Sequence, residues 1–376
     1  MAQAQPATPL PYDAHPIRTL DPADTDYSDL HPLGEAIGGA QVVVLGEQTH
    51  GDGAALLAKT RVVQYLHAER GFDVLVMESG FYDCAKAWAL TPDGRAARCW
   101  LPVWRDVVQT DALRRYLSAT DGSLALAGMD NQLTGVARAH LIDDLRAQGI
   151  DAPERFWQAL SGLMQPVPAQ PSAEAQVQFY ADLAAVQAQV PPESSWAQVL
   201  DGVAVLAGQW WGNADIDSYI RRDVQMAENL LWLLEHRYAG RKLIVWTGGY
   251  HAVRNLHTAR TAPGTPLVYA SHTTTADVLH AALGDDLYVI NTTAAGGTFF
   301  DYETRTTRPV PAAESGTFEA RLATHFTAAF ANVQGAHTPM SGTPAYNYVP
   351  LAGDWSQLVD GVLFIREMTP SEIRRP

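Results

Sequence analysis

Five short apolar segments, separated by stretches with helical patterning, constrain the fold of this chain more than any other feature. They are Gln41–Leu45, Asp73–Met77, Leu124–Met129, Lys242–Trp246 and Asp286–Ile290. Apolar segments of this length with helices between them are typical of parallel strands that are buried on both faces of a sheet. We therefore predict an α/β fold with a mainly parallel central sheet flanked by helices.

The region from Asp151 to Arg237 contains no strand-like segment, and amphipathic stretches interrupted by prolines take its place. In its last part, apolar residues recur at helical spacing from Ile216 to Leu234, which predicts a helix over Asp215–Arg237. No long charged or Ser/Gly-rich linker divides the 376 residues. We expect one domain over residues 1–376, with a mostly helical insertion at residues 151–237.

The charge of the chain limits the partners that it can bind. Its formal net charge is −15, whereas nucleic acids and anionic membrane surfaces are bound by clustered Lys and Arg. Its apolar runs are also far shorter than the roughly 18 residues that a membrane-spanning helix needs. We expect a small neutral or cationic molecule as the partner, with neither nucleic acid nor membrane.

The only two cysteines, Cys84 and Cys99, are too far apart in sequence for the close pairs of zinc or thioredoxin-like sites. A disulfide between them would close a short loop and would favour an exported protein. The first residues contain neither the basic nor the apolar region of a signal peptide. We expect a soluble protein that is exported and has lost its signal peptide, with a cytoplasmic location as the alternative.

Ionisable side chains follow four of the predicted strands, where each strand ends. They are Glu47 and His50, then Glu78, then Asp130, and finally His251 after Gly248-Gly249. Ligands bind at the carboxyl ends of the strands in open α/β sheets, and these ends meet at one edge when the strands are parallel. The sequence therefore predicts that these side chains converge on one site.

Histidine has an ordinary pKa close to neutrality, so His50 can serve as a general base if a carboxylate from Glu47 or Glu78 orients its ring. The alternative for His50 is a capping role in a glycine-flanked turn. The two glycines before His251 would let the backbone approach a ligand closely. The alternative for His251 is a core histidine bonded to the backbone. We predict Glu47, His50, Glu78 and His251 as catalytic residues.

Further side chains are candidates for substrate binding. Lys59 lies in the apolar stripe of a helix expected near Ala54–Arg70, so it either extends to the rim or enters the site as a cation for a developing oxyanion. Arg222 can clamp a carboxyl group or an oxyanion, or form a surface ion pair. The predicted substrate-binding residues are Lys59, Arg61, Asp130, Arg222 and Tyr219. For Arg61, a solvated or salt-bridged residue is the alternative.

Other hydrolase signatures are missing from the sequence. It contains neither a Gly-x-Ser-x-Gly nucleophile elbow nor a His-Glu-x-x-His zinc helix, and neither cysteine has a histidine beside it in the sequence. Water activated by histidine is therefore favoured over a serine or cysteine nucleophile, and we expect no cofactor and no metal.

A series of motifs runs through most of the chain. In order they are Gly46-Glu47-Gln48-Thr49-His50-Gly51, Lys59 with Arg61, Gly71–Ser79, Gly128-Met129-Asp130, Arg222-Asp223 with Met226 and Asn229, Trp246 with His251, and Leu283-Gly284 before Tyr288. In these residues the chain resembles the erythromycin esterases and their ChaN-like and succinoglycan-biosynthesis relatives.

This resemblance implies a metal-independent hydrolysis that opens a macrolide lactone, with His50 as general base for water. It also implies that Glu47, Glu78 and His251 support the site and that Lys59 binds substrate. The chain departs from the macrolide-inactivating members at two places, because it has Ala54 where they carry Glu, and Gly248-Gly249 where they carry His-Asn. We expect hydrolysis of a carboxylic ester or lactone, with macrolides as one candidate substrate.

Two other functions use the same residues. In a metal-dependent hydrolase, the predicted catalytic carboxylates and imidazoles would be ligands of a divalent cation. The Glu-x-x-His spacing of carboxylate metal sites usually lies on a helix, whereas here it falls in a turn after a strand. The second alternative is a non-catalytic protein that binds haem or a natural product.

Overall fold

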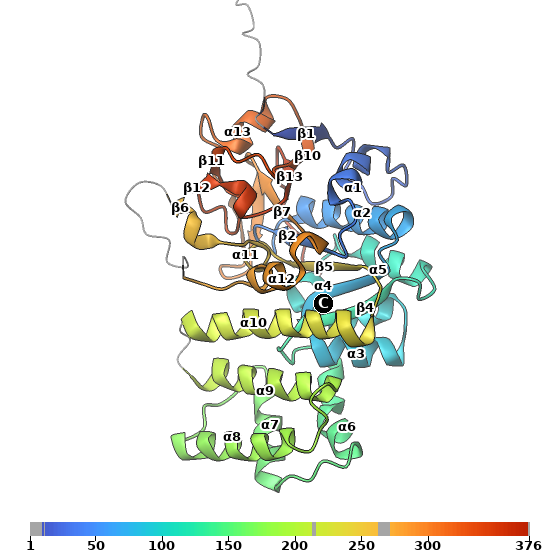
Figure 1. The fold of residues 1–376 in the computed structure, drawn as a ribbon, viewed down its shortest axis with the longest axis vertical. Coiled ribbons are helices and arrows are strands. Elements are labelled where there is room, and N and C mark those ends of the chain that lie inside the picture. Colours follow the sequence, from blue (N-terminus) through green and yellow to red (C-terminus); the bar gives the residue numbers. More distant parts are fainter. Residues whose placement is uncertain (1–9, 11, 213–215, 262–270, 375–376) are drawn as a thin grey trace, which may run out of the picture.

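An eight-stranded sheet forms the centre of the computed structural model, which describes residues 10, 12–212, 216–261 and 271–374 (Figure 1). The strand order is β1-β10-β13-β7-β2-β5-β3-β4. These strands are β1 (Asp13–Pro16), β2 (Val42–Glu47), β3 (Val74–Gly80), β4 (Ala125–Asp130), β5 (Leu243–Gly248), β7 (Leu287–Ala294), β10 (Ala328–Asn332) and β13 (Gly361–Ile365). The six strands from β13 to β4 are parallel to their neighbours, whereas β10 and β1 add an antiparallel edge.

The prediction of a mainly parallel α/β fold is confirmed. All five predicted strands are present, as β2, β3, β4, β5 and β7. The antiparallel strands β1 and β10 were not predicted, and neither was the parallel strand β13. β1 is only partly buried at the sheet edge, and β10 consists mostly of alanine, so neither contains the large and β-branched apolar residues that identified the central strands.

Helices cover both faces of the sheet. They are α1 (His31–Ile37), α2 (Gly53–Arg70), α3 (Phe81–Leu90), α4 (Pro102–Arg105), α5 (Asp111–Ala119), α6 (Leu141–Ala147), α7 (Glu154–Leu163), α8 (Ala173–Gln187), α9 (Ser195–Trp211), α10 (Ile216–Trp232), α11 (Gly249–Ala252), α12 (Thr275–Leu283) and α13 (Phe318–Ala323). Short helical turns are η1 (Ser28–Leu30), η2 (Gly94–Cys99), η3 (Val136–His140), η4 (Leu233–Arg237), η5 (Leu256–Thr258), η6 (Gly284–Asp286) and η7 (Trp355–Gln357). No helix in the described part of the chain has the length and apolar character to cross a bilayer.

Between β4 and β5, the described residues form helices and no strands. Figure 1 shows α7, α8 and α9 stacked at the far side of α10 from the sheet. The helix that we predicted over Asp215–Arg237 is present as α10, continued by η4, and Asp215 itself lies outside the described residues. The segment predicted as a helical insertion therefore folds as helices, and α10 connects it to the sheet.

The side chains of β2 show why the central strands are apolar along their whole length. Val42 and Val44 belong to the core that also contains apolar residues of α9 and α10. Val43 and Leu45 point the other way, into the core formed with α2 and α5. Since successive side chains of a strand point to opposite faces, a strand between two helical layers must be apolar at every position.

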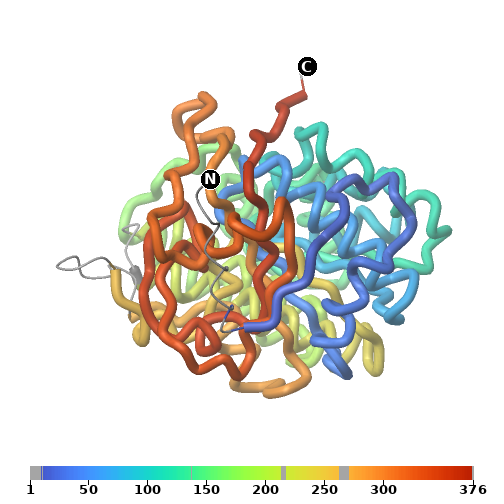
Figure 2. The backbone as a smooth tube through the Cα atoms, turned by 90° about the horizontal axis from the view of Figure 1, so that it is seen from above, coloured from blue at the N-terminus to red at the C-terminus, as the bar shows by residue number. Residues whose placement is uncertain are grey.

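Two smaller sheets lie in the second half of the chain. One has the order β11-β12-β6, with β11 (Pro339–Gly342), β12 (Leu351–Asp354) and β6 (Arg260–Thr261), and the other is the hairpin of β8 (Thr298–Asp301) and β9 (Thr306–Pro309). Figure 2 shows the orange hairpin and the red C-terminal segment on the same side of the molecule. The hairpin contacts the turn after β2, where the N–H of Phe300 donates to the carbonyl of Gly51 at 3.1 Å.

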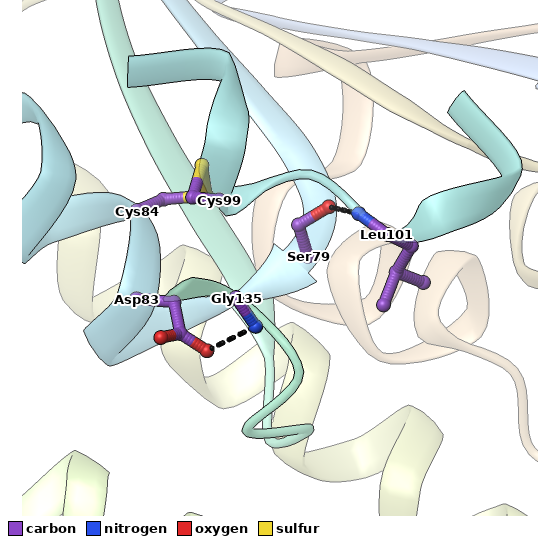
Figure 3. Close-up of a disulfide and its surroundings, with 6 residues drawn as sticks. All are labelled: Ser79, Asp83, Cys84, Cys99, Leu101 and Gly135. Atoms are coloured by element: carbon purple, nitrogen blue, oxygen red, sulfur yellow. Dashed lines mark hydrogen bonds between the residues drawn. A yellow bond between two sulfur atoms is a disulfide. The ribbon is translucent and has the colours of Figure 1, made fainter. Parts of the chain in front are cut away.

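A disulfide between Cys84 and Cys99 ties η2, the segment that follows α3, back to α3 (Figure 3). Cys84 lies in α3 and Cys99 is the last residue of η2. Two residues further along, the N–H of Leu101 donates to the Oγ of Ser79 at 3.0 Å. These two connections fix η2 and the start of α4 against the carboxyl edge of the sheet.

We predict that the disulfide stabilises the protein. Replacing both cysteines, as Cys84→Ala with Cys99→Ala, should lower the free energy of unfolding by about 3 kcal/mol, because a loop of about 15 residues is then no longer closed in the unfolded chain. Denaturant unfolding of this variant and of the disulfide-bonded wild type measures the effect, and reduced wild type is the control for the change of side chains. Two free thiols in the denatured, unreduced wild type would contradict the prediction.

Asp83, the neighbour of Cys84, makes stability depend on pH. Burial raises the pKa of Asp83 to about 7, although the N–H of Gly135 opposes this by donating to its carboxylate at 2.9 Å (Figure 3). An acid whose pKa is higher in the folded protein than in the unfolded chain contributes to the stability of the folded state. This contribution is complete below the unfolded pKa of about 4, and it is lost as the pH rises through the folded pKa.

We therefore predict that the free energy of unfolding of wild type, relative to Asp83→Asn, falls between about pH 4 and pH 7, by at most roughly 4 kcal/mol. Denaturant unfolding at a series of pH values measures this difference. The matched control is Asp121→Asn, at an exposed position. A difference that stays constant over this pH range would show that Asp83 is ionised throughout.

Candidate active site

The turn that follows β2 is held by two of its own side chains and by Tyr348, which comes from a distant part of the chain. The Asp52 carboxylate accepts hydrogen bonds from the backbone N–H of Thr49 at 3.0 Å and from the hydroxyl of Tyr348 at 2.9 Å. The side-chain oxygen of Gln48 accepts from the backbone N–H of Tyr348 at 3.0 Å. Burial raises the pKa of Asp52 to about 7. The turn is therefore rigid where it presents His50.

Glu47, the last residue of β2, has a fully buried carboxylate with three donors. Its Oε1 accepts from His50 Nδ1 and from Trp104 Nε1, both at 3.0 Å. Its Oε2 accepts from Lys59 Nζ, which also donates to the Thr247 carbonyl at 3.1 Å. Burial lowers the pKa of Lys59, and the Glu47 charge opposes this. We call Glu47, His50, Lys59 and Trp104 the Glu47 cluster.

His50 connects the Glu47 cluster to solvent. Its Nδ1 faces the carboxylate of Glu47, so the proton of the neutral ring lies on Nδ1 and the lone pair lies on Nε2. The imidazole is 35% exposed and lines a pocket of about 550 Å³. Trp104 packs edge-on against it, with 4.9 Å between the ring centroids. The geometry thus orients the imidazole and leaves a basic nitrogen at the pocket.

A second group of charges lies beside the first. The Arg222 guanidinium, from α10, donates to both carboxylate oxygens of Asp130, at 3.1 and 2.6 Å, and to Glu78 Oε1 at 2.8 Å. Glu78 Oε2 accepts from the Thr247 hydroxyl at 2.7 Å and from the Gly248 N–H at 2.8 Å. Burial alone would raise the pKa of Glu78, but the neighbouring cationic groups outweigh it and hold this pKa well below its ordinary value.

His251 belongs to the same group. Its Nδ1 lies 2.7 Å from Asp223 Oδ1, and its Nε2 lies 3.3 Å from Glu78 Oε1. Burial would lower the pKa of His251, but the two carboxylates outweigh it and raise this pKa to about 10. Asp223 is in turn fixed by the N–H and hydroxyl of Thr275, at 2.8 and 2.7 Å. The two carboxylates thus favour the imidazolium form of His251. We call Glu78, Asp130, Arg222, Asp223 and His251 the Glu78 cluster.

Glycines allow the two clusters to lie next to each other. A Cβ on Gly248 would lie 3.1 Å from the His50 ring and 3.6 Å from the Glu78 carboxylate. A Cβ on Gly249 would lie 2.7 Å from the Glu47 carbonyl, closer than real Cβ atoms come. The end of β5 and the turn after it therefore need small residues at these two positions. Packing in this chain thus explains why it has Gly248-Gly249 where the macrolide-inactivating members carry His-Asn.

The walls of the pocket come from segments that the sequence did not mark as functional. They are the β8–β9 hairpin with Phe299, Phe300, Asp301, Tyr302, Glu303, Arg308 and Pro309, the following residue Pro311, and the segment Tyr346-Asn347-Tyr348. Asn347 and Tyr348 both have positive φ. Aromatic side chains show no periodicity that distinguishes a pocket wall from a core, so only the fold reveals this role.

The structure brings the four predicted catalytic residues together, but it places the predicted substrate-binding residues outside the pocket wall. Lys59 is fully buried beneath Glu47, and Asp130 and Arg222 are paired with each other. Arg61 lies outside both clusters, and its guanidinium donates two hydrogen bonds to the Asp29 carboxylate, at 2.7 and 3.0 Å. Arg61 is therefore salt-bridged, which was the alternative to a substrate-binding role, and its side chain is buried.

Tyr219 is 49% exposed on α10 and is not among the residues that line the pocket. Sequence reasoning also missed Trp104 and Asp223, which bind Glu47 and His251. Asp223 could have been found, because it follows Arg222 in one of the motifs noted above. Trp104 gave no signal, because it lies in a short helical turn far from either cluster in sequence.

The residues of this site do not fit a divalent cation. Within residues that the structure describes, no group of three or more His, Cys, Asp or Glu side chains is arranged to hold a metal ion. The carboxylate of Glu47 is bound by Lys59, and that of Glu78 by Arg222. Cationic side chains thus occupy the positions that a metal would need.

Several known proteins are similar to this chain. The protein named "Putative hydrolase YbfO" of Bacillus subtilis (strain 168) is 25% identical over 412 aligned positions, which cover 94% of this chain and 90% of that protein. A solved succinoglycan biosynthesis protein has a TM-score of 0.77 at 19% identity, with 96% of each chain covered. A variant of the erythromycin esterase EreC, in its open conformation, has a TM-score of 0.67 at 16% identity, with 95% of this chain and 98% of that chain covered.

The two structural similarities, at these identities, concern the fold alone. The family model described as Erythromycin esterase matches residues 67–367. The matched part contains the Glu78 cluster, and the turn with Glu47 and His50 precedes it. Because the match spans most of the chain, this protein belongs to the erythromycin esterase family.

Proposed function

We propose that this protein hydrolyses a carboxylic ester or lactone, with water activated by His50. The observation that carries the proposal is the pairing of a half-exposed imidazole in a pocket with a fully buried carboxylate, since this fixes one ring nitrogen and leaves the other free to accept a proton. Membership of the erythromycin esterase family and the names of YbfO and EreC support hydrolysis.

In the proposed reaction, His50 Nε2 takes a proton from water as the water oxygen attacks the carbonyl carbon. The carbonyl π bond breaks and its electron pair moves to oxygen, giving a tetrahedral intermediate. This intermediate collapses when the bond to the alkoxy oxygen breaks, and the imidazolium returns its proton to that oxygen. Glu47 stabilises the imidazolium in between through its contact with Nδ1.

The Glu78 cluster supports this chemistry electrostatically. Its carboxylates and its cations, Arg222 and His251, are buried and paired, so their charges are fixed before substrate arrives. Glu78 lies close enough to His50 for their charges to interact. Fixed charges around a reacting group need little reorganisation during the reaction.

The pocket favours a substrate with substantial apolar surface. Its volume of about 550 Å³ lies within the range of sites for drug-sized ligands. Aromatic side chains contribute much of its wall, including Phe299, Phe300, Tyr302 and Tyr346. A macrocyclic lactone is therefore one candidate substrate, and simpler lactones and aryl esters are the others to be screened.

We predict that His50→Asn folds normally and loses roughly two to four orders of magnitude in kcat, the range for removal of a general base. The assay is hydrolysis of whichever ester or lactone the wild type cleaves in a screen of macrolides, simple lactones and aryl esters. His257→Asn, at an exposed histidine outside the pocket, is the matched control. Near-full turnover by His50→Asn would refute the mechanism.

Chelation separates this mechanism from a metal-dependent one. We expect the wild type to retain its activity after treatment with a chelator, because Lys59 and Arg222 already neutralise the two carboxylates. If His50 were a metal ligand, chelation and His50→Asn would both abolish activity, and purified protein would contain stoichiometric metal. Elemental analysis of the purified protein completes this comparison.

We predict that Lys59 acts by positioning Glu47. Lys59→Met should lower stability by about 3–5 kcal/mol, because it leaves a buried carboxylate without its cation. A buried carboxylate without a counter-charge also binds a proton at higher pH, so the acidic limb of the pH–rate profile should move upwards. The control is Lys242→Met, a lysine outside both clusters. Unchanged stability together with an unchanged profile would show that Lys59 has no such role.

A further inference from the structure

A second hollow lies on the surface formed by η2, α4, α5 and the C-terminal segment, and we call it the arginine pocket. Its volume is about 500 Å³, and it shares no lining residue with the pocket that contains His50. Six arginines line it: Arg95, Arg98, Arg105, Arg114, Arg115 and Arg374. They are six of only 26 Lys and Arg residues in a chain whose formal net charge is −15.

The positive charge of the arginine pocket is only partly balanced. The ion pairs are Arg95 with Asp93 at 2.7 Å, Arg105 with Asp106 at 2.9 Å, Arg114 with Asp111 at 3.0 Å, and Arg374 also with Asp111. Three carboxylates thus face six guanidinium groups. Within the described part of the chain, the side chains of Arg98 and Arg115 make neither an ion pair nor a hydrogen bond, and both residues are exposed.

The walls of the arginine pocket are held in place by contacts that need no ligand. The disulfide at Cys99 anchors η2, and the N–H of Gly94 donates to the hydroxyl of Ser118 in α5 at 3.1 Å (Figure 3 shows the disulfide). The backbone N–H of Arg374 donates to the Asp106 carbonyl at 2.8 Å, which fixes the C-terminal segment. A preformed site does not have to order its walls when it binds.

Arg114 shows that the positive charges of the arginine pocket repel one another. Its guanidinium lies 5.4 Å from the Trp100 ring and donates to the Trp104 carbonyl at 3.2 Å, so it cannot swing away. Burial lowers the pKa of Arg114, and the neighbouring Arg105 lowers it further, against the opposing effect of Asp106. An anion between these side chains would offset this repulsion.

We propose that the arginine pocket binds a compact oxyanion with several negative charges, carried by phosphate or carboxylate groups. Arginine presents a planar fork of donors that matches both groups in a bidentate manner, and the lining contains arginine without lysine. Guanidinium groups from four separate segments surround the hollow, which suits a ligand with several anionic groups. Nothing in the proposed hydrolysis uses this pocket.

The charge of the whole molecule selects a compact ligand over a polymer. Nucleic acids and sulfated polysaccharides bind along extended basic surfaces. Here six arginines line one hollow of a protein whose net charge is strongly negative, so a polymer that extended from the pocket would be repelled by that net charge. A small anion is surrounded by the arginines and avoids that repulsion.

Calorimetric titration of the complete protein with tripolyphosphate, and separately with citrate, tests the proposal at constant ionic strength. We expect single-site binding of at least one of these anions, and the stronger one identifies phosphate or carboxylate as the preferred group. Arg98→Gln with Arg115→Gln should weaken binding by about tenfold or more, since it removes two charge-assisted contacts. Because neither side chain has a partner in the described structure, folding should be unaffected.

The control is Arg260→Gln with Arg321→Gln, which removes the same charge from two exposed positions outside the pocket. We expect binding by this variant to change by less than about twofold, because distant exposed charges are screened. An equal loss in both variants would overturn the proposal, since only net charge would then matter. Absence of binding by both anions at millimolar concentration, or tighter binding of heparin than of either, would also overturn it.

Discussion

The buried carboxylate of Glu47 is the constraint on which the arrangement of this site depends. An ionised carboxylate without partners is too costly to bury, so each of its oxygens must be satisfied by donors. Lys59 supplies the compensating charge from α2, Trp104 supplies a neutral donor from α4, and the remaining donor is the imidazole of His50. The hydrogen bond that His50 donates to the buried carboxylate of Glu47 thus also orients the imidazole of His50.

The parallel sheet explains why residues far apart in sequence form these clusters. Neighbouring strands in the order β2-β5-β3-β4 all end at one edge, so Glu47, Glu78 and Asp130 emerge near one another, with His251 just beyond β5. This part could be predicted, because apolar segments locate the strands and the residues after them define the edge. The pocket wall could not, because β8 is partly buried and β9 is exposed along their whole lengths, so neither strand has a regular alternation.

Lys59 and Arg61 of α2 show what the sequence could not predict, which is the partner of a buried side chain. Lys59 and Arg61 are cations two positions apart on one helix, and both are buried. Lys59 meets Glu47, which is 12 residues earlier, whereas Arg61 meets Asp29 from the N-terminal segment. Helical periodicity shows which way each side chain points, but the partner is supplied by whichever segment packs there. The apolar stripe therefore located Lys59 correctly and gave no information about the carboxylate above it.

The two clusters together restrict which group can exchange a proton during a reaction. The carboxylate of Glu78 is held ionised by the cations around it, and His251 is held protonated by the carboxylates of Glu78 and Asp223. Arg222 is more firmly protonated than a free arginine, since Asp130 and Glu78 outweigh the effect of burial on its pKa. Each of these charges is therefore part of a fixed electrostatic environment. His50 differs because its Nδ1 is bound by Glu47 while its ring is partly exposed in the pocket, and in the proposed reaction the acid–base role therefore belongs to this imidazole.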